Sequence, residues 1–288
     1  MKWESEAEWR PYRVETRVRI PELYSMFVRK CPSGYDFPGE THDFWECLYV
    51  LRGEVCVSGD DRVYQLSEGD IIFHKPLEMH KFYVEHGAGA DLLIFSFTLD
   101  SAQRSFFAEK AFSLSEEQKG LLSSMLVYMD QRMAEMDVPE DVVLTKRYLY
   151  PSCVNHVYLQ AIVLYLERLF LSLLEQADTT ELFDSAESRL FSDAVNCMKK
   201  HIHTGLSVAE LAEMCNISIS GLKRIFDKYA GISVHKYFLK LKLQNAVEML
   251  MGGATVSETA VSLGFSSQAY FTKAFRRELG QNPSEIKK

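Results

Sequence analysis

The sequence lacks the marks of an exported or membrane-spanning protein. Its first ten residues, MKWESEAEWR, are acidic and have no apolar core, so we expect no signal peptide. The most apolar helical stretch, 157–174, carries Gln160, Glu167 and Arg168, and central charges argue against insertion into a bilayer. Six cysteines are scattered without a CxxC pair or a zinc-finger spacing, which fits a reducing compartment. We therefore expect a cytoplasmic protein without a membrane partner.

Positive charge is scarce over the whole chain, which has a formal net charge of -8. The deficit is confined to one part of the chain. Residues 187–288 hold 14 Lys/Arg against 9 Asp/Glu, whereas residues 1–186 hold 18 against 31. Contacts with phosphate are local, so a basic C-terminal part on an acidic carrier can bind nucleic acid. The 288 residues have room for two or three domains.

The stretch 256–284, VSETAVSLGFSSQAYFTKAFRRELGQNPS, predicts a helix, a tight turn and a second helix. Gly264 stands where the chain must reverse, and Ser266 or Ser267 can cap the second helix. Four residues at three- and four-residue spacing predict its buried stripe: Tyr270, Phe271, Ala274 and Phe275. The opposite face is polar and cationic, as suits a helix laid in a DNA major groove; it carries Gln268, Thr272, Lys273, Arg276 and Arg277.

The same pattern occurs once before, in residues 206–233. Before the turn the two copies match at an offset of 48, with Asn216 in the place of Gly264. Asn is the next most tolerant residue at such a reversal. After the turn the offset is 49, pairing Leu222 with Phe271 and Gly231 with Gly280, so the second copy has one extra residue at its turn. An internal repeat is a much stronger signal than either copy alone.

The tandem unit, about 192–288, resembles the DNA-binding domain of the AraC/XylS family of bacterial transcription regulators. The resemblance is carried mainly by A-x-x-x-GF-S-x-Q-x-YF-x-K-x-FR-R-x-x-G-x-x-P in the second copy. Three departures bear on base preference: Lys273 and Lys242 stand where arginine is usual, and Ile286-Lys287 replaces an aromatic-Arg ending. Helix 190–203 is expected to open the domain and helix 234–250 to join its halves.

The resemblance implies which side chains approach DNA. In the first unit these are Ser220, Lys223 and Arg224; in the second they are Gln268, Ala269, Thr272 and Lys273. Arginine makes bidentate contacts with guanine and glutamine with adenine, so we expect Arg224 and Gln268 to read bases. Arg276 and Arg277 lie farther along the helix and are expected to meet phosphate, which positions without specifying sequence.

The N-terminal part predicts a small barrel or double-sheet jelly roll, so the fold class is α+β with several domains. Short β-branched or aromatic runs alternate there with Gly, Pro and Asp turn signals. The expected strands are 13–20, 23–31, 45–51, 54–58, 63–66, 71–74, 81–84 and 90–98.

Within this part, H42-D-F-W-E46 followed by Gly53, Gly69-Asp70, Pro76 and His80 resembles the cupin-type sensor domain of many AraC-family regulators. Alternate residues of a strand share a face, so the predicted ligand pocket is lined by His42, Phe44, Glu46, His80 and Phe82.

A metal is the alternative occupant of this pocket, because two histidines and one carboxylate form a known iron site. Glu40 stands where metal-binding barrels of this type carry their first histidine, which disfavours it. We therefore expect neither a cofactor nor a metal. Glu46 serving only to tie strand ends together is a further alternative. His74 and Trp45 are expected to be rim or packing residues.

Residues 101–185 turn helical. Leu122, Met125, Met129 and Met133 mark one amphipathic helix. A second helix carries a short heptad seam: Leu159, Ile162, Leu166, Leu169 and Leu173. The family resemblance implies dimerisation in this region, and packing of the helix on the barrel is the alternative. We expect three parts: a sensor at 1–100, a dimerisation region at 101–185 ending in a linker from 178, and a DNA-binding domain at 186–288.

Together these features predict a ligand-responsive transcription regulator and not an enzyme. Its expected partners are promoter DNA, a small-molecule effector (a sugar is common in the family), a second copy of the chain and RNA polymerase. Two other hypotheses remain open: a metal-dependent cupin enzyme, an isomerase or dioxygenase, fused to a DNA-binding tail, and a constitutive architectural DNA binder.

Overall fold

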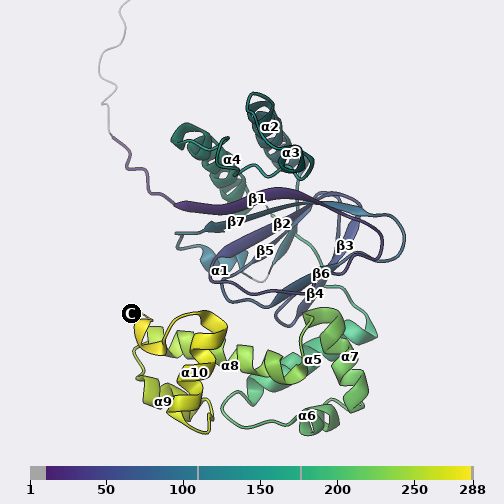
Figure 1. Ribbon diagram of the computed structural model, residues 1–288, viewed down its shortest axis with the longest axis vertical. Coiled ribbons are helices and arrows are strands. Elements are labelled where there is room, and N and C mark those ends of the chain that lie inside the picture. Colours follow the sequence, from purple (N-terminus) through teal and green to yellow (C-terminus); the bar gives the residue numbers. More distant parts are fainter. Residues whose placement is uncertain (1–10, 109, 176, 287–288) are drawn as a thin grey trace, which may run out of the picture.

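The structure is a computed structural model that describes residues 11–108, 110–175 and 177–286. The expectations for the first ten residues and for Lys287 lie outside the described residues. Two helices cover one side of a β-sandwich, and a bundle of shorter helices lies against its other end (Figure 1). The chain is therefore α+β, with every described strand except the short Asp178–Thr179 in its N-terminal half and the helix-turn-helix units in its C-terminal third.

In the described residues, nine strands form two sheets. The larger sheet has the order β1-β7-β2-β5-β8-β9 and the smaller one β4-β3-β6. Seven of the eight predicted strands are present. The strands are β1 (Glu22–Cys31), β2 (Trp45–Arg52), β3 (Glu54–Gly59), β4 (Arg62–Ser67), β5 (Asp70–His74), β6 (His80–Tyr83), β7 (Ala90–Thr98), β8 (Ala111–Ser113) and β9 (Asp178–Thr179).

The prediction of a strand at 13–20 is wrong. The segment carries no ladder, and Val18 and Ile20 bury their side chains in the core beneath the outer helices. The Ile20 amide donates to Glu167 Oε1 at 2.8 Å. The β-branched pattern therefore reflects tertiary burial of an extended segment and not strand pairing.

The inner faces of the two sheets enclose one apolar core. Leu48, Leu92 and Ile94 come from the larger sheet, and Val57 and Phe82 come from the smaller one. Alternation along β2 directs Leu48 into this core and the neighbouring Cys47 to the outer face. The interior of the sandwich thus follows the period-two pattern of the sequence.

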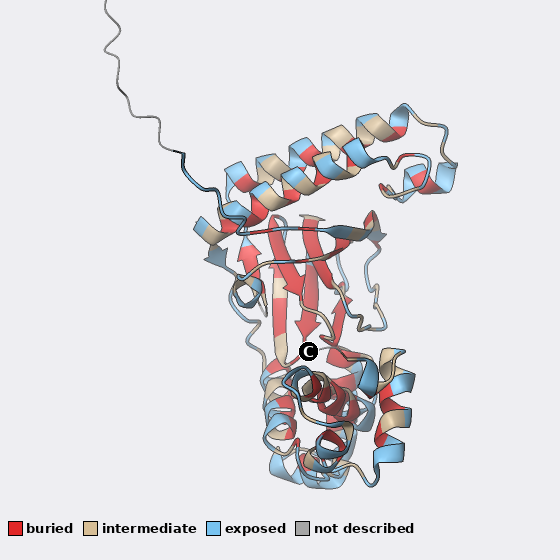
Figure 2. Ribbon diagram, turned by 90° about the vertical axis from the view of Figure 1, so that its left-hand side faces the viewer, coloured by how far each residue is buried: buried red, intermediate tan, exposed pale blue. Residues whose placement is uncertain are grey.

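The outer face of the larger sheet is covered by α2 (Glu116–Ala134) and α4 (His156–Glu175), with the short α3 (Glu140–Leu144) beside α2. Phe107 of the short α1 (Arg104–Phe107) contacts Phe170 of α4, with ring centroids 5.3 Å apart. Figure 2 shows both long helices with a buried side toward the sheet and an exposed side away from it. The four residues that predicted α2 are buried, as are Phe73, Phe95 and Phe97 of the sheet.

This packing corrects the predicted dimer seam. Ile162, Leu166, Leu169 and Leu173 have exposed fractions of 0% and belong to the core shared with the sheet and α2. Leu159 is half-buried. A heptad pattern of two repeats does not distinguish a seam between chains from a seam within one chain. The alternative interpretation, a helix packed on the barrel, holds for these residues. The three-part division into 1–100, 101–185 and 186–288 stays a prediction.

The C-terminal helices form two helix-turn-helix units joined by one long helix. They are α5 (Ala186–Lys200), α6 (Val208–Met214), α7 (Ile219–Ala230), α8 (Val234–Met251), α9 (Val256–Ser262), α10 (Gln268–Leu279) and the 3₁₀ turn η1 (Pro283–Glu285). Asn216 and Gly264 both have positive φ, at 51° and 65°. Ser218 caps α7 and Ser267 caps α10, so the extra residue in the second turn is confirmed. Tyr270, expected in the buried stripe, is 44% exposed.

Lys242 on α8 ties the two units together. Its buried Nζ donates to the carbonyl of Leu263, which ends α9, at 2.7 Å, and to that of Thr204, which precedes α6, at 2.9 Å. Carbonyls at helix ends lack partners within the helix, and a cation is favoured there. The lysine that replaces the family's usual arginine is therefore a structural residue of the domain.

We predict that Gly264→Ala destabilises the C-terminal domain. A Cβ at this position would stand 2.9 Å from the carbonyl oxygen of His203, and the left-handed backbone costs a non-glycine residue about 1–2 kcal/mol. Gly205→Ala is the matched control, because no heavy atom lies within 4 Å of its added Cβ. Thermal unfolding followed by circular dichroism should show a lower midpoint for the first variant only. Equal midpoints would refute the strained turn.

Candidate functional site

The exposed face of α10 gathers the side chains expected to contact DNA. Six of them line one open groove together with Asn282 from the following turn: Gln268, Ala269, Thr272, Lys273, Arg276 and Arg277. Thr272 is half-buried and the other five are exposed. The opposite side of the helix buries Phe271, Ala274 and Phe275. The helix is therefore held by one face and presents three cations and two polar side chains on the other.

The matching helix α7 presents Ser220, Lys223 and Arg224, all exposed. Arg224 has a carboxylate partner from another helix, whereas Arg277 on α10 pairs with its neighbour Glu278. Arg224 Nη2 lies 3.0 Å from Glu187 Oε1 at the start of α5, and Lys228 Nζ lies 2.9 Å from the other oxygen. The hydrogen bond from Lys228 keeps the pKa of Glu187 below its usual value. DNA must share or replace this carboxylate when Arg224 approaches a base.

The predicted ligand pocket also assembles. Residues from β1, from β2 and the segment before it, and from β6 and β7 line a cavity of about 260 Å³ at the end of the sandwich; its lining includes His42, Phe44, Glu46 and Phe82. His80 reaches the same group of side chains: its Nε2 lies 3.4 Å from Glu46 Oε1. His42 Nε2 lies 3.7 Å from Glu46 Oε2. The structure thus places all five predicted residues together.

Charge is concentrated at the floor of this pocket. Burial opposes the charged form of Glu46, but the contacts with His42 and His80 outweigh it and hold the pKa of this carboxyl well below its usual value. Burial likewise opposes a charge on His80, yet Glu40 and Glu46 raise its pKa to about 10. With nothing bound between them, the two groups therefore favour an ion pair over neutral forms.

The sequence prediction left out several residues that line the pocket, among them Glu40, Ser96 and Arg29. Glu40 brings a carboxylate to 3.7 Å from His80 Nε2, Ser96 Oγ donates to Glu46 Oε2 at 3.2 Å, and Arg29 lines the cavity. The alternation of Glu40 with His42 in an extended segment was the available signal for the first. The other two lie on β7 and β1, and only the register of β7 with β2 and of β1 with β7 brings them near.

The expectations for His74 and Trp45 can be assessed from their surroundings. His74 is buried behind His80, stacks on its ring at 4.3 Å and pairs with Glu78 at 3.1 Å. Burial and the nearby charge of His80 lower the pKa of His74. Trp45 is 4% exposed and lies in the core under α4, on the face of β2 away from the cavity. Both are packing residues with respect to the pocket.

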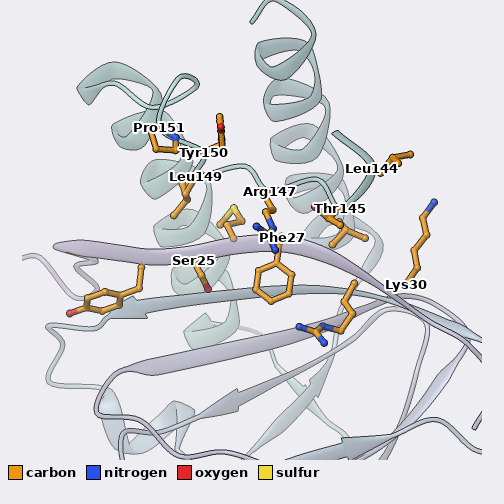
Figure 3. Close-up of a pocket in the computed structure, with 13 residues that line it drawn as sticks. Ser25, Phe27, Lys30, Leu144, Thr145, Arg147, Leu149, Tyr150 and Pro151 are labelled. Atoms are coloured by element: carbon orange, nitrogen blue, oxygen red, sulfur yellow. The ribbon is translucent and has the colours of Figure 1, made fainter. Parts of the chain in front are cut away.

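A larger cavity of about 680 Å³ lies along β1, under the segment 144–151 (Figure 3). Leu149, Tyr150 and Pro151 lie above the strand, and Phe27 lies below it. Its cationic lining consists of Arg29, Lys30 and Arg147. Ligand sites typically combine apolar walls with a few converging polar groups. The smaller pocket meets this description better, because histidines and carboxylates converge there.

The sensor sandwich and the first helix-turn-helix unit share an interface. The turn between β3 and β4 inserts between α5 and α8: Tyr237 Oη donates to the carbonyl of Asp60 at 2.7 Å, and Lys199 Nζ pairs with Asp61 Oδ1 at 2.6 Å. Gln244 donates to the carbonyl of Leu77. Cys56, Val63 and Met79 of the sandwich lie in the hydrophobic core of the C-terminal helices. The two parts are therefore packed together by both apolar and polar contacts.

The C-terminal end of α7 also contacts the sandwich at this interface. Ser58 Oγ donates to the carbonyl of Tyr229 near the end of α7. Gly231, which caps α7 with a φ of 67°, lies so close to Pro38 that an added Cβ would collide with its carbonyl oxygen. The end of the first recognition helix thus rests directly on the sensor, and the residues that it touches flank His80.

Comparison with known protein families gives two matches. The AraC-like ligand binding domain matches residues 22–122, and a helix-turn-helix domain matches residues 211–288. The two matched segments coincide with the parts that hold the pocket and the repeated units.

Relatives align over most of the chain. The Msm operon regulatory protein of Streptococcus mutans is 26% identical over 90% of this chain and 89% of its own length. The transcriptional activator RhaR of Pectobacterium atrosepticum is 23% identical over 86% of this chain and 85% of its own. The virulence regulon activator VirF of Yersinia enterocolitica is 23% identical over 83% of this chain and 88% of its own.

Solved structures similar to this chain include ToxT of Vibrio cholerae with a bound unsaturated fatty acid. It is 12% identical, covers 96% of both chains and has a TM-score of 0.36. An AraC-type regulator from Chromobacterium violaceum is 27% identical over 36% of this chain and 93% of its own, with a TM-score of 0.34. Both family matches and the full-length relatives agree with the repeat and the sensor domain: this chain belongs to the AraC family of transcriptional regulators, with an AraC-like ligand-binding domain followed by a helix-turn-helix DNA-binding domain.

Proposed function

We propose that this chain is a cytoplasmic dimeric regulator in which a small effector in the sensor pocket controls promoter binding by the two helix-turn-helix units. One observation carries the proposal: two exposed basic recognition faces belong to a helical unit that packs directly on the sensor beside its pocket. The long helix α8 connects the two units. Recognition helices enter successive major grooves when they are held about 34 Å apart.

The effector is a small polar molecule bound by Glu46, His42 and His80. The pocket offers carboxylate acceptors, imidazoles that donate or accept, and aromatic walls from Phe44 and Phe82. This combination suits the hydroxyl groups and the apolar ring face of a sugar. A thermal-shift screen of metabolites tests it, because a specific ligand raises the unfolding midpoint by mass action.

Coupling runs through β6. His80 faces the pocket, whereas Met79 beside it lies in the core of the C-terminal helices and Lys81 lies near Gly231. Both recognition faces are exposed while the parts are docked. Docking of the two parts therefore does not block the binding of DNA. Its role is to fix the position of the DNA-binding domain relative to α4, the helix that mediates the proposed dimer.

The dimer uses the outward face of α4 in place of the buried seam. Val157, Leu164 and Leu171 follow one another at seven-residue spacing and are 75%, 59% and 41% exposed. Exposed apolar stripes of this kind mark protein contacts. Among the described helices α4 alone has the length and apolar content to cross a bilayer, and its other side is occupied by the sheet.

Regulation of transcription follows from promoter occupancy, through recruitment or exclusion of RNA polymerase. Several relatives bear names of transcriptional activators, which favours recruitment. The relatives are regulators and not enzymes, so the cupin enzyme hypothesis has no support from them. A constitutive architectural role would leave the converging side chains of the pocket without a purpose.

For DNA recognition we predict different effects of two arginine substitutions. Arg224→Ala should cost about 1–3 kcal/mol of binding and relax the preference at one base position. Arg277→Ala should weaken binding to all sequences alike and reduce its salt dependence, because phosphate contacts release counterions. Selection of binding sites with each variant measures this. The assignment fails if Arg277→Ala changes the selected sequence and Arg224→Ala does not.

For interdomain coupling we predict that Asp61→Ala combined with Tyr237→Phe leaves binding to a single DNA site within about twofold and removes cooperative binding to paired sites. The variant loses two contacts of the interface but none of the recognition faces. Asp193→Ala, an exposed carboxylate on the same helix as Lys199, is the control. Gel shifts with single and paired sites decide. Unchanged cooperativity would show that docking does not set the domain position.

For the dimer we predict that Leu164→Asp with Leu171→Asp gives folded monomers, as measured by sedimentation. Exposed positions tolerate a carboxylate, whereas an interface does not. Leu166→Asp is the contrasting variant and should unfold the sensor, because its side chain is fully buried. Dimers that persist in the Leu164/Leu171 variant would move the interface to another surface.

A further inference from the structure

Four side chains of the sensor pocket bring atoms that can bind a metal close to one another. One oxygen each of Glu40 and Glu46 and one nitrogen each of His42 and His80 all lie within 4.8 Å of one another. His80 is 2% exposed and Glu46 is 8% exposed. The four come from two separate stretches of chain, 40–46 and β6, which the fold brings together through paired hydrogen bonds between Glu40 and His80 backbone groups.

Both imidazoles are held in the orientation of a ligand. His42 Nδ1 lies 2.9 Å from the carbonyl oxygen of Phe44, and His80 Nδ1 lies 3.1 Å from that of Glu78. A carbonyl only accepts, so each Nδ1 carries the hydrogen, and in the neutral ring the lone pair is on Nε2. Histidines bound to metals show this arrangement, with the distal nitrogen fixed by a carbonyl or carboxylate.

The two Nε2 atoms are left without hydrogen-bond partners. Both are buried, and neither meets hydrogen-bond criteria with the carboxylates, which stand 3.4–3.7 Å away. Buried polar atoms without partners are rare in native structures and indicate a missing partner such as an ion. A pair of charges could account for the proximity, but it would not account for two unpartnered nitrogens directed at one point.

We propose that Glu40, His42, Glu46 and His80 bind one divalent first-row transition metal cation. Two imidazoles with two carboxylates suit iron, cobalt, nickel, manganese or zinc better than calcium or magnesium, which prefer oxygen ligands alone. The adjoining cavity of about 260 Å³ leaves room for water or effector oxygens as further ligands. The proposal deepens the proposed sensor function, because a cation here would join the segment before β2 to β6 and so bear on the strand that contacts the DNA-binding domain.

The sequence argument against a metal rested on Glu40 standing in place of a histidine. In the structure Glu40 does not remove a ligand; it supplies a carboxylate at the rim, with its side chain 46% exposed. Replacing one neutral imidazole by a carboxylate keeps the number of ligands and adds negative charge, which favours a divalent cation. The departure from the usual pattern therefore changes the type of donor and not the number of donors.

The test uses the untagged full chain after treatment with a chelator and dialysis. Titration with CoCl₂, followed by calorimetry and by the visible absorption of the cobalt ion, should show one site per chain. His42→Gln and Glu46→Gln should each weaken binding by more than the 10–100-fold that loss of an outer partner of a metal ligand costs. His86→Ala, an exposed histidine outside the pocket, should bind as the unsubstituted chain does. Glu40→Gln, at the rim, serves if either buried variant fails to fold.

Absence of saturable cobalt binding, or equally tight binding in all pocket variants, would overturn the metal site. The DNA-binding function is measured separately on the same metal-free chain. If the chain shows salt-dependent DNA binding but no metal site, the metal proposal is wrong and the proposed function is retained. If the chain binds the metal but does not bind DNA, the metal proposal is retained and the proposed function is wrong.

Discussion

The arrangement of the whole molecule depends on the β3–β4 turn that inserts between α5 and α8. Asp60 adopts a left-handed backbone conformation at φ 46° and is buried at the tip of this turn. Its carbonyl accepts from Tyr237, its carboxylate lies near Lys75 and Gln244, and its neighbour Asp61 pairs with Lys199. Buried polar groups are costly unless all are paired, so this turn fits only when the helices stand as they do. The sensor thereby fixes the position of the first helix-turn-helix unit.

The same constraint connects the pocket to the recognition helix α7 through a short series of contacts. β6 contributes His80 to the pocket and pairs with β3, whose end forms the inserted turn. Ser58 of β3 binds both the carbonyl of Lys81 and that of Tyr229 at the end of α7. A ligand that moves β6 must therefore strain or shift the contact with α7. Packed cores respond to such displacement by discrete rearrangement because they have little free space.

Much of this account could be predicted from the sequence. The repeat predicted the two turns down to the extra residue, because Gly and Asn are favoured at left-handed positions and Ser is a favoured helix cap. Strand alternation likewise placed His42, Phe44 and Glu46 on one face. Two of the predictions that failed depended on tertiary context: the leucine seam of α4 faces the sheet and not a partner, and in 13–20 only Val18 and Ile20 are buried, without strand pairing. Arg29, Ser96 and the interface at Asp60 join residues far apart in sequence, which no local pattern reveals.

The central claim is that the pocket and the end of α7 form one mechanical unit, and hydrogen–deuterium exchange of the full chain tests it most directly. Glu46→Gln changes the pocket floor without touching the C-terminal helices. The account predicts faster exchange in β6 and at residues 229–232 together, with no change in α9 and α10. Faster exchange confined to the sandwich, with residues 229–232 as protected as before, would contradict it.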